Sequence, residues 1–231
     1  KKLSVIVPCY NEEKVLEIFY DKLLEVLKSI KERYTYEILF VDDGSKDNTF
    51  HIICELQRKD KDIIPITFSR NFGKEAAIYA GLEKSTGDIV VVVDADLQHP
   101  PEVIIDMVKG IEDGFDSVTT KRVNRNGESS FKKFFSRIFY KLMGKISSAN
   151  IVQGAQDYRM MTREVVEAIL SLKEYNRFSK GIFSWVGFKV KYIEVPTVER
   201  AAGETKWSFY KLFKYAIEGI TSFSTAPLKL S

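Results

Sequence analysis

The feature that most constrains the fold is an alternation, over the first 120 residues, of short apolar runs with segments whose apolar residues recur at helical spacing. The clearest run, residues 89–93, has five consecutive β-branched residues, which is typical of a strand buried on both faces of a parallel sheet. Strands and helices that alternate at this pitch form right-handed βαβ units. The sequence therefore predicts an α/β domain with a doubly wound, mostly parallel central sheet flanked by helices.

The expected elements follow this rhythm up to residue 120 and lose it afterwards. Strands are expected over residues 3–7, 37–41, 63–68, 88–93, 115–120, 158–161 and 188–195. Helices are expected over residues 12–31, 47–59, 74–85, 100–114, 129–147, 163–171, 178–185 and 207–223. Pro65 has no backbone N–H, so the third strand is expected near an edge of the sheet.

Charge is distributed unevenly along the chain. The net charge of +3 is too small to argue for a nucleic-acid partner, and none is expected. Residues 121–145, the basic arm, carry eight Lys or Arg residues against one acid, Glu128. The simplest interpretation of the basic arm is a charged face exposed to solvent. The interleaved phenylalanines instead indicate a surface that contacts anionic lipid headgroups. The two cysteines show no CxxC spacing, which disfavours a disulfide framework or a zinc site.

Polar residues follow each of the first four predicted strands, at residues 8–12, 42–45, 69–74 and 94–98. In open α/β sheets, ligands bind beyond the carboxyl ends of the strands, so these clusters should meet at one edge and form a site. The usual phosphate-binding loops are absent. No GxGxxG follows the first strand, and Lys74 is followed by Glu75 rather than by Ser or Thr.

Asp94 and Asp96 offer another way to hold a phosphate. Two carboxylates at a strand end can converge on one Mg²⁺ or Mn²⁺, which readily bridges carboxylate to phosphate. A cation there would stabilise the charge that develops on a diphosphate leaving group. The alternative is a capped turn before the helix that starts at Pro100.

The other polar residues leave alternatives open. Asp42 is interpreted as an acceptor for a nucleotide base, against an Asx-turn or helix cap, while residues 43–45 are assigned to turn chemistry. Tyr10 packs on the base or is a core tyrosine. His99 precedes two prolines and is not expected to be catalytic, and His51 is expected at the surface.

Several strings together resemble the inverting GT-A glycosyltransferases of family 2. They are Val7-Pro8-Cys9-Tyr10-Asn11-Glu12, Val41-Asp42-Asp43-Gly44-Ser45 and Asp94-Ala95-Asp96. The longer strings Arg70-Asn71-Phe72-Gly73-Lys74, Asp94 to Glu102 and Gln153 to Arg159 are similar to the polyprenyl-phosphate glycosyltransferases. These include the bactoprenol glucosyltransferases and, more distantly, dolichol-phosphate mannose synthase. The similarity covers nearly the whole chain.

The resemblance implies a GT-A fold and transfer of a hexose, with inversion, from a UDP-sugar to a polyprenyl phosphate. It implies catalytic roles for Asp157 and Asp96 and a metal, Mg²⁺ or Mn²⁺, held by Asp94, Asp96 and Gln98. The implied nucleotide-sugar site comprises Pro8, Tyr10, Glu12, Asp42, Lys74, Asp94, Ala95 and Gln98. The implied sites for the acceptor phosphate are Arg122, Arg125, Arg200 and Lys206.

On this reading, residues 1–120 form a nucleotide-sugar-binding half and residues 121–205 an acceptor-binding half of the same GT-A domain. Residues 206–231 form an amphipathic, helical juxtamembrane segment, and family members usually continue into transmembrane helices at this point. The full-length protein is therefore expected to be anchored at the cytoplasmic face of the membrane, with a homo-oligomer possible. The rivals are a family 2 enzyme that acts on a saccharide or protein, and a non-catalytic nucleotide-sugar-binding module.

Overall fold

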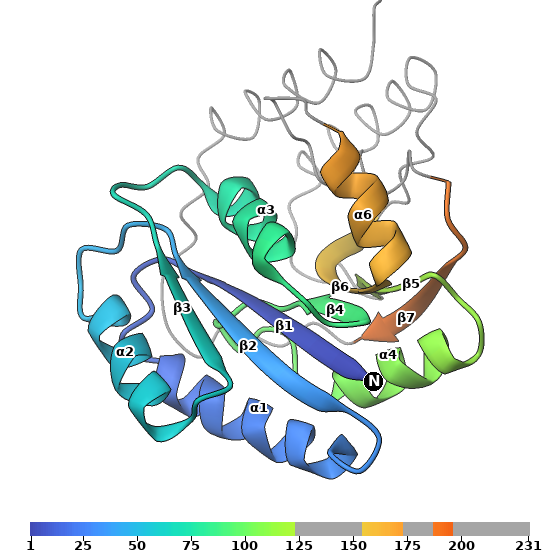
Figure 1. Ribbon diagram of the computed structural model, residues 1–231, viewed down its shortest axis with the longest axis horizontal. Helices are drawn as coiled ribbons and strands as arrows, with labels where there is room; N and C mark the ends of the chain where they lie inside the picture. The colour runs from blue at the N-terminus through green and yellow to red at the C-terminus, as the bar shows by residue number, and fades with distance from the viewer. Residues whose placement is uncertain (123–153, 173–186, 196–231) are drawn as a thin grey trace, which may run out of the picture.

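A computed structural model of the chain describes residues 1–122, 154–172 and 187–195 (Figure 1). The predicted helices at residues 129–147, 178–185 and 207–223 lie outside these residues. Among the described helices, none has both the length and the apolar character that a membrane span requires.

Seven strands form one sheet in the order β3-β2-β1-β4-β6-β5-β7. Their bounds are β1 Lys2–Cys9, β2 Thr35–Asp42, β3 Ile63–Thr67, β4 Ile89–Val92, β5 Ser117–Arg122, β6 Ala155–Thr162 and β7 Val190–Val195. β3 lies at the edge, as Pro65 predicts. Strands β1 to β4 are mutually parallel, whereas β6 runs antiparallel to both of its neighbours, β4 and β5. The predicted mostly parallel α/β sheet is confirmed, and the reversed direction of β6 is an addition to it.

Helices cover both faces of the sheet (Figure 1). They are α1 Leu16–Ile30, α2 Thr49–Lys59, α3 Lys74–Lys84, α4 Val103–Glu112 and α6 Arg163–Ser171. Figure 1 shows α1, α2 and α4 on one face and α3 and α6 on the other. The predicted helix at residues 12–31 begins only at Leu16, because residues 10–15 belong to a loop at the sheet edge.

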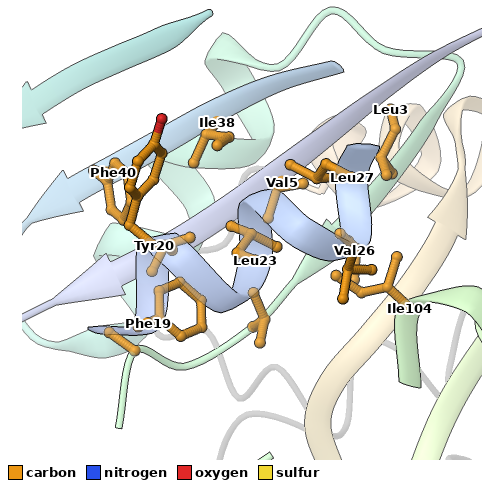
Figure 2. Close-up of a cluster of buried hydrophobic side chains, with 14 of the residues drawn as sticks. Leu3, Val5, Phe19, Tyr20, Leu23, Val26, Leu27, Ile38, Phe40 and Ile104 are labelled. Atoms are coloured by element: carbon orange, nitrogen blue, oxygen red, sulfur yellow. The ribbon is translucent and has the colours of Figure 1, made fainter. Parts of the chain in front are cut away.

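A continuous apolar cluster fixes the sheet against α1. Buried residues on α1 recur every three or four positions, so one stripe of the helix faces the sheet. Figure 2 shows Phe19, Leu23 and Leu27 of this stripe near Val5 and Phe40 of the sheet. Ile6 and Leu39, the neighbours of Val5 and Phe40 along their strands, belong to the opposite cluster under α3 and α6. The central strands are thus buried on both faces, which leaves their ends as the place for a site.

Candidate active site

Four loops lie at the carboxyl-terminal edge of β1, β2, β3 and β4, because these strands are parallel. They comprise residues 10–15, 43–48, 68–73 and 93–102. The structure therefore brings the four polar clusters to one edge, as predicted.

The first two loops are locked together by hydrogen bonds. The backbone N–H of Asn11 donates to Ser45 Oγ at 2.9 Å, and the N–H of Lys46 donates to Asn11 Oδ1 at 2.9 Å. The N–H of Glu12 donates to Thr49 Oγ1 at 2.8 Å. Asn11 has a left-handed backbone, with φ of 56°, a conformation that asparagine tolerates better than most residues. The segment that carries the predicted nucleotide contacts is therefore tied to the following loop and to α2 by side-chain hydrogen bonds.

Asp42 is buried at the end of β2 and already takes part in local structure. Its carboxylate accepts hydrogen bonds from the backbone N–H of Ser45 at 3.2 Å and from Thr67 Oγ1 at 2.9 Å. The turn weighed as the alternative for Asp42 therefore exists. Each carboxylate oxygen can accept a second bond, so the contact with a nucleotide base stays a prediction.

Asp43 has a larger role than the turn assigned to it. Its carboxylate accepts from the backbone N–H groups of Phe72 at 2.7 Å and Gly73 at 2.9 Å, just before α3. Burial raises the pKa of Asp43, and these two backbone donors oppose the shift. Gly44 has φ of 65°, and a Cβ there would lie 2.7 Å from Arg70 Cα. Asp43 and Gly44 thus bind the second loop closely to the third.

The reversed direction of β6 explains how Asp157 reaches the site. The antiparallel register pairs Val92 of β4 with Arg159 of β6, so Asp94, two residues after Val92, and Asp157, two residues before Arg159, lie at the same end of this strand pair. Lys74, the first residue of α3, joins the two carboxylates. Its Nζ lies 2.7 Å from Asp94 Oδ1 and 3.3 Å from Asp157 Oδ2. Asp157 is thus held in an ion pair, with Lys74 as the partner.

The charge of Lys74 is held in place by these two carboxylates. Burial lowers the pKa of Lys74, but Asp94 and Asp157 outweigh it and keep the pKa above its usual value. The side chain is 39% exposed, so the ammonium remains within reach of a ligand. A phosphate that entered the site would meet a fully protonated lysine.

The loop after β4 turns sharply between the two acids and α4. Asp96 Oδ1 accepts from the backbone N–H of Gln98 at 3.0 Å, and Leu97 has φ of 58°, which is uncommon for a leucine. Such strain is found at sites where the surroundings impose the conformation. No side chain caps the N-terminus of α4 by a hydrogen bond. The turn alternative for Asp96 is thus realised locally, without a helix cap.

His99 stands beside the two acids. One ligand atom each from Asp94, Asp96 and His99 lie within 4.8 Å of one another, a grouping that could hold a metal ion. Burial lowers the pKa of His99, against opposing contributions from Asp94 and Asp96, which leaves the imidazole neutral at pH 7. His99 was not among the metal ligands expected from the sequence. Its position directly after the Asp94-x-Asp96 turn was the available signal.

The remaining predicted residues divide into three groups. Pro8, Tyr10, Glu12, Ala95 and Gln98 lie on β1 or in the loops of the site edge, and their roles stay predictions. Arg122 is the last residue of β5, which runs parallel to β1, so it ends at the same edge. Arg125, Arg200 and Lys206 lie outside the described residues. His51 is exposed on α2, as expected.

The family model for glycosyl transferase family 2 matches residues 4–170. The chain belongs to this family. A prophage bactoprenol glucosyl transferase homolog of Escherichia coli (strain K12) is 45% identical over 99% of this chain and 74% of its own length. The bactoprenol glucosyl transferase of Shigella phage SfX shows the same identity and coverage. The putative glycosyltransferase CsbB of Bacillus subtilis (strain 168) is 43% identical over 99% of this chain and 68% of its own length.

Solved structures support the fold. A mannosyltransferase from Pyrobaculum calidifontis, in complex with GDP-Man and Mn²⁺, has a TM-score of 0.66 at 20% identity. That alignment covers 95% of this chain and 63% of the other. Glucosyl-3-phosphoglycerate synthase from Mycobacterium tuberculosis, with Mn²⁺, UDP-Glc and phosphoglyceric acid, has a TM-score of 0.56 at 17% identity, with coverage of 96% and 78%. The glycosyltransferase fold expected from the sequence is confirmed. The family match and the sequence relatives confirm the assignment as a glycosyltransferase.

Proposed function

We propose that this chain transfers a hexose, with inversion, from a UDP-sugar to a polyprenyl phosphate at the cytoplasmic face of the membrane. The observation that carries the proposal is the 45% identity, over nearly the whole chain, to relatives named bactoprenol glucosyl transferases. Bactoprenol is a membrane lipid, so this acceptor would require the enzyme to work at the membrane surface, and anchoring of the full-length protein belongs to the same proposal.

The donor half of the site is argued from the acids after β4. Two carboxylates and an imidazole gathered within 4.8 Å suit a divalent cation such as Mn²⁺ or Mg²⁺. Asp94 and Asp96 would hold that cation, which neutralises charge on the diphosphate as the sugar bond breaks. Lys74 would meet the diphosphate from the α3 side, since its ammonium already lies at Asp94. The rigid loops after β1 and β2 would bind the uridine.

The acceptor determines what Asp157 must do. A sugar hydroxyl has a pKa far above 7, so its attack needs a general base. A phosphate monoester is ionised near neutrality, with a second pKa of about 6. It needs placement and charge screening more than proton removal. We therefore assign Asp157 to positioning, and the acceptor phosphate to the predicted cations Arg122, Arg125, Arg200 and Lys206.

The test is transfer from radiolabelled UDP-glucose to a polyprenyl phosphate in detergent with Mn²⁺. UDP-galactose, GDP-mannose and a panel of free saccharides serve as comparison substrates. We expect labelled lipid, no labelled saccharide, and loss of product with EDTA. Turnover on saccharides without any on the lipid phosphate would overturn the acceptor assignment in favour of the rival family 2 activity.

The pH–rate profile tests the role of Asp157 within the same assay. If Asp157 positions the acceptor, the acidic limb should follow the acceptor phosphate and persist, at a lower rate, in Asp157→Asn. Loss of that limb in Asp157→Asn would make Asp157 the base.

A further inference from the structure

We propose that His99 is a further protein ligand of the divalent cation at the donor site, beside Asp94 and Asp96 and in addition to the predicted oxygen ligand Gln98. The inference deepens the proposed function, because it assumes that this edge of the sheet binds a cation together with the nucleotide.

The first observation is an unsatisfied pair of nitrogens. His99 is 7% exposed, and neither Nδ1 nor Nε2 makes a hydrogen bond of standard geometry within the described parts of the chain, although the side chain of Gln156 lies near enough to raise the pKa of the ring. A buried polar group without a partner is costly, and such a group calls for an explanation, which a bound ion can supply. The imidazole lies with the carboxylates of Asp94 and Asp96 within 4.8 Å, so a cation that contacts both acids would also be within reach of the ring.

The second observation is that the ring is held in place from behind. Tyr158 of β6 is buried, and its ring centroid lies 5.5 Å from that of His99 in a tilted arrangement. The hydroxyl of Tyr158 donates to the carbonyl oxygen of Pro100 at 3.1 Å, which fixes the residue after His99. Ligands whose rings are oriented by their neighbours bind metal with little reorganisation. The packing therefore presents His99 to the acids without any contribution from the nucleotide.

An imidazole ligand changes which metal the site prefers. Carboxylate oxygens suit Mg²⁺ and Mn²⁺ alike, whereas imidazole nitrogen suits the later transition metals and is a poor ligand for Mg²⁺. Two carboxylates alone would discriminate little between Mg²⁺ and Mn²⁺. With His99 included, the site should favour Mn²⁺ and Co²⁺ over Mg²⁺.

The experiment measures metal binding to the UDP-bound protein, without acceptor and without turnover. His99→Phe keeps a ring against Tyr158 and removes both nitrogens, and His99→Gln keeps one neutral oxygen ligand. His51→Phe is the matched control, because His51 is the chain's other histidine and is 68% exposed on α2. Free Mn²⁺ is followed by electron paramagnetic resonance, and Mg²⁺ affinity is taken from competition.

Loss of an outer partner of a metal ligand commonly costs about 10–100-fold in affinity, so loss of the ligand itself should weaken Mn²⁺ binding at least about tenfold in His99→Phe. Mg²⁺ binding should change much less, so the preference for Mn²⁺ falls. His99→Gln should show the same fall in preference, and His51→Phe should show neither effect. Unchanged Mn²⁺ affinity in both His99 variants would overturn the proposal. An equal loss for both metals would do so as well, since it indicates only disturbed packing.

A second readout follows the rings in the unaltered protein and does not depend on the folding of the His99 variants. With two histidines in the chain, the ring nitrogen spectrum contains two sets of signals, and His51→Phe assigns them. Zn²⁺ and UDP should shift one ring nitrogen of His99 and leave His51 in place. An unshifted His99 ring under saturating metal would refute ligation. Failure of sugar transfer to polyprenyl phosphate, with these shifts intact, would count against the proposed acceptor and not against His99.

Discussion

The charged side chains at the two ends of the central strands differ in how fully the chain itself supplies their partners. Glu37, near the start of β2, is 4% exposed and fully supplied with partners. It accepts from Ser4 Oγ at 2.6 Å and from the backbone N–H of Thr86 at 2.7 Å, and it pairs with Lys2 Nζ at 2.6 Å. Ser4 Oγ in turn accepts from the N–H of Gly87 at 2.8 Å. Among the described residues, the chain itself thus supplies several partners to the buried carboxylate of Glu37 at this amino-terminal edge.

The carboxyl-terminal edge is incomplete by comparison. One ammonium, that of Lys74, is shared between Asp94 and Asp157, and the nitrogens of His99 make no hydrogen bond of standard geometry among the described residues. The same strands thus end in an arrangement that a cation and a phosphate would complete. Substitutions at the amino-terminal edge should therefore cost stability, whereas substitutions at the carboxyl-terminal edge should cost binding and catalysis.

Asp96→Asn should give the largest effect. It replaces a charged oxygen ligand by a neutral one of similar shape, and loss of one group that stabilises transition-state charge typically costs about 10²–10³ in rate. We expect at least that loss in kcat for sugar transfer, with the melting temperature nearly unchanged. The matched control is Asp106→Asn on α4, where the carboxylate is 61% exposed and pairs with Lys109 at 2.9 Å. Transfer by Asp96→Asn within a few-fold of wild type would remove Asp96 from the metal site.

Glu37→Gln should show the converse pattern. The amide keeps an acceptor for Ser4 and Thr86 but loses the charge that pairs with Lys2. Hydrogen bonds and pairs of this buried, charged kind are worth about 1–3 kcal/mol, so we expect that loss in the free energy of unfolding by urea at pH 7. The affinity for UDP with Mn²⁺ should stay unchanged. A variant of normal stability and weakened UDP binding would invert the comparison.

The pH dependence of the unfolding free energy provides a further test of Glu37→Gln. Burial raises the pKa of Glu37, but the hydrogen bonds from Lys2, Ser4 and Thr86 outweigh it and bring the pKa below its usual value. A folded-state pKa below the unfolded one makes the stability contribution present above about pH 4.5 and lost as the pH falls through the folded-state pKa. The gap in unfolding free energy between wild type and Glu37→Gln should therefore close as the pH is lowered from 7 to 3. A constant gap over that range would show that ionisation of Glu37 is not its source.

The local parts of the fold could be predicted from the sequence. The apolar run at residues 89–93 predicts a strand buried on both faces, and β4 is buried throughout. Pro65 predicts the edge position of β3. The direction of β6 could not be predicted, because an apolar strand has the same pattern in either direction. Its neighbour β4 also lies more than 60 residues earlier in the chain.

The same limit applies to the site, where local features could be predicted from the sequence and long-range contacts could not. Asp94 and Asp96 are found from their spacing after a buried strand, which is local information. The pairing of Lys74 with Asp157 spans 83 residues and depends on the register of β6. The place of His99 depends on the turn at Leu97 and on the ring of Tyr158 behind it. Interactions that rest on such distant packing leave no periodic pattern in the sequence.

Lys74→Met should give the smallest effect and separates two roles of the lysine. Methionine is unbranched and apolar, so the substitution removes the ammonium and keeps much of the side chain. Without the ammonium, Asp94 loses a competitor for its oxygens, so Mn²⁺ alone should bind a few-fold tighter. UDP at saturating Mn²⁺ should bind more weakly, because a phosphate contact is lost. For a side chain that is 39% exposed, that contact is worth at most about 1 kcal/mol, or about fivefold in Kd.

Tighter Mn²⁺ binding together with weaker UDP binding would identify Lys74 as a counter-ion that the metal displaces from Asp94. Isothermal titration of Mn²⁺, and of UDP with Mn²⁺ present, measures them separately. Lys109→Met is the matched control, since that ammonium is 61% exposed and pairs with Asp106 away from the site. Both differences should shrink between 10 mM and 500 mM salt, because the Debye length falls from about 30 Å to only a few ångströms. A parallel fall in both affinities would instead make Lys74 a brace that orients Asp94 and Asp157, and the carboxyl-terminal edge would then be as self-sufficient as the edge around Glu37.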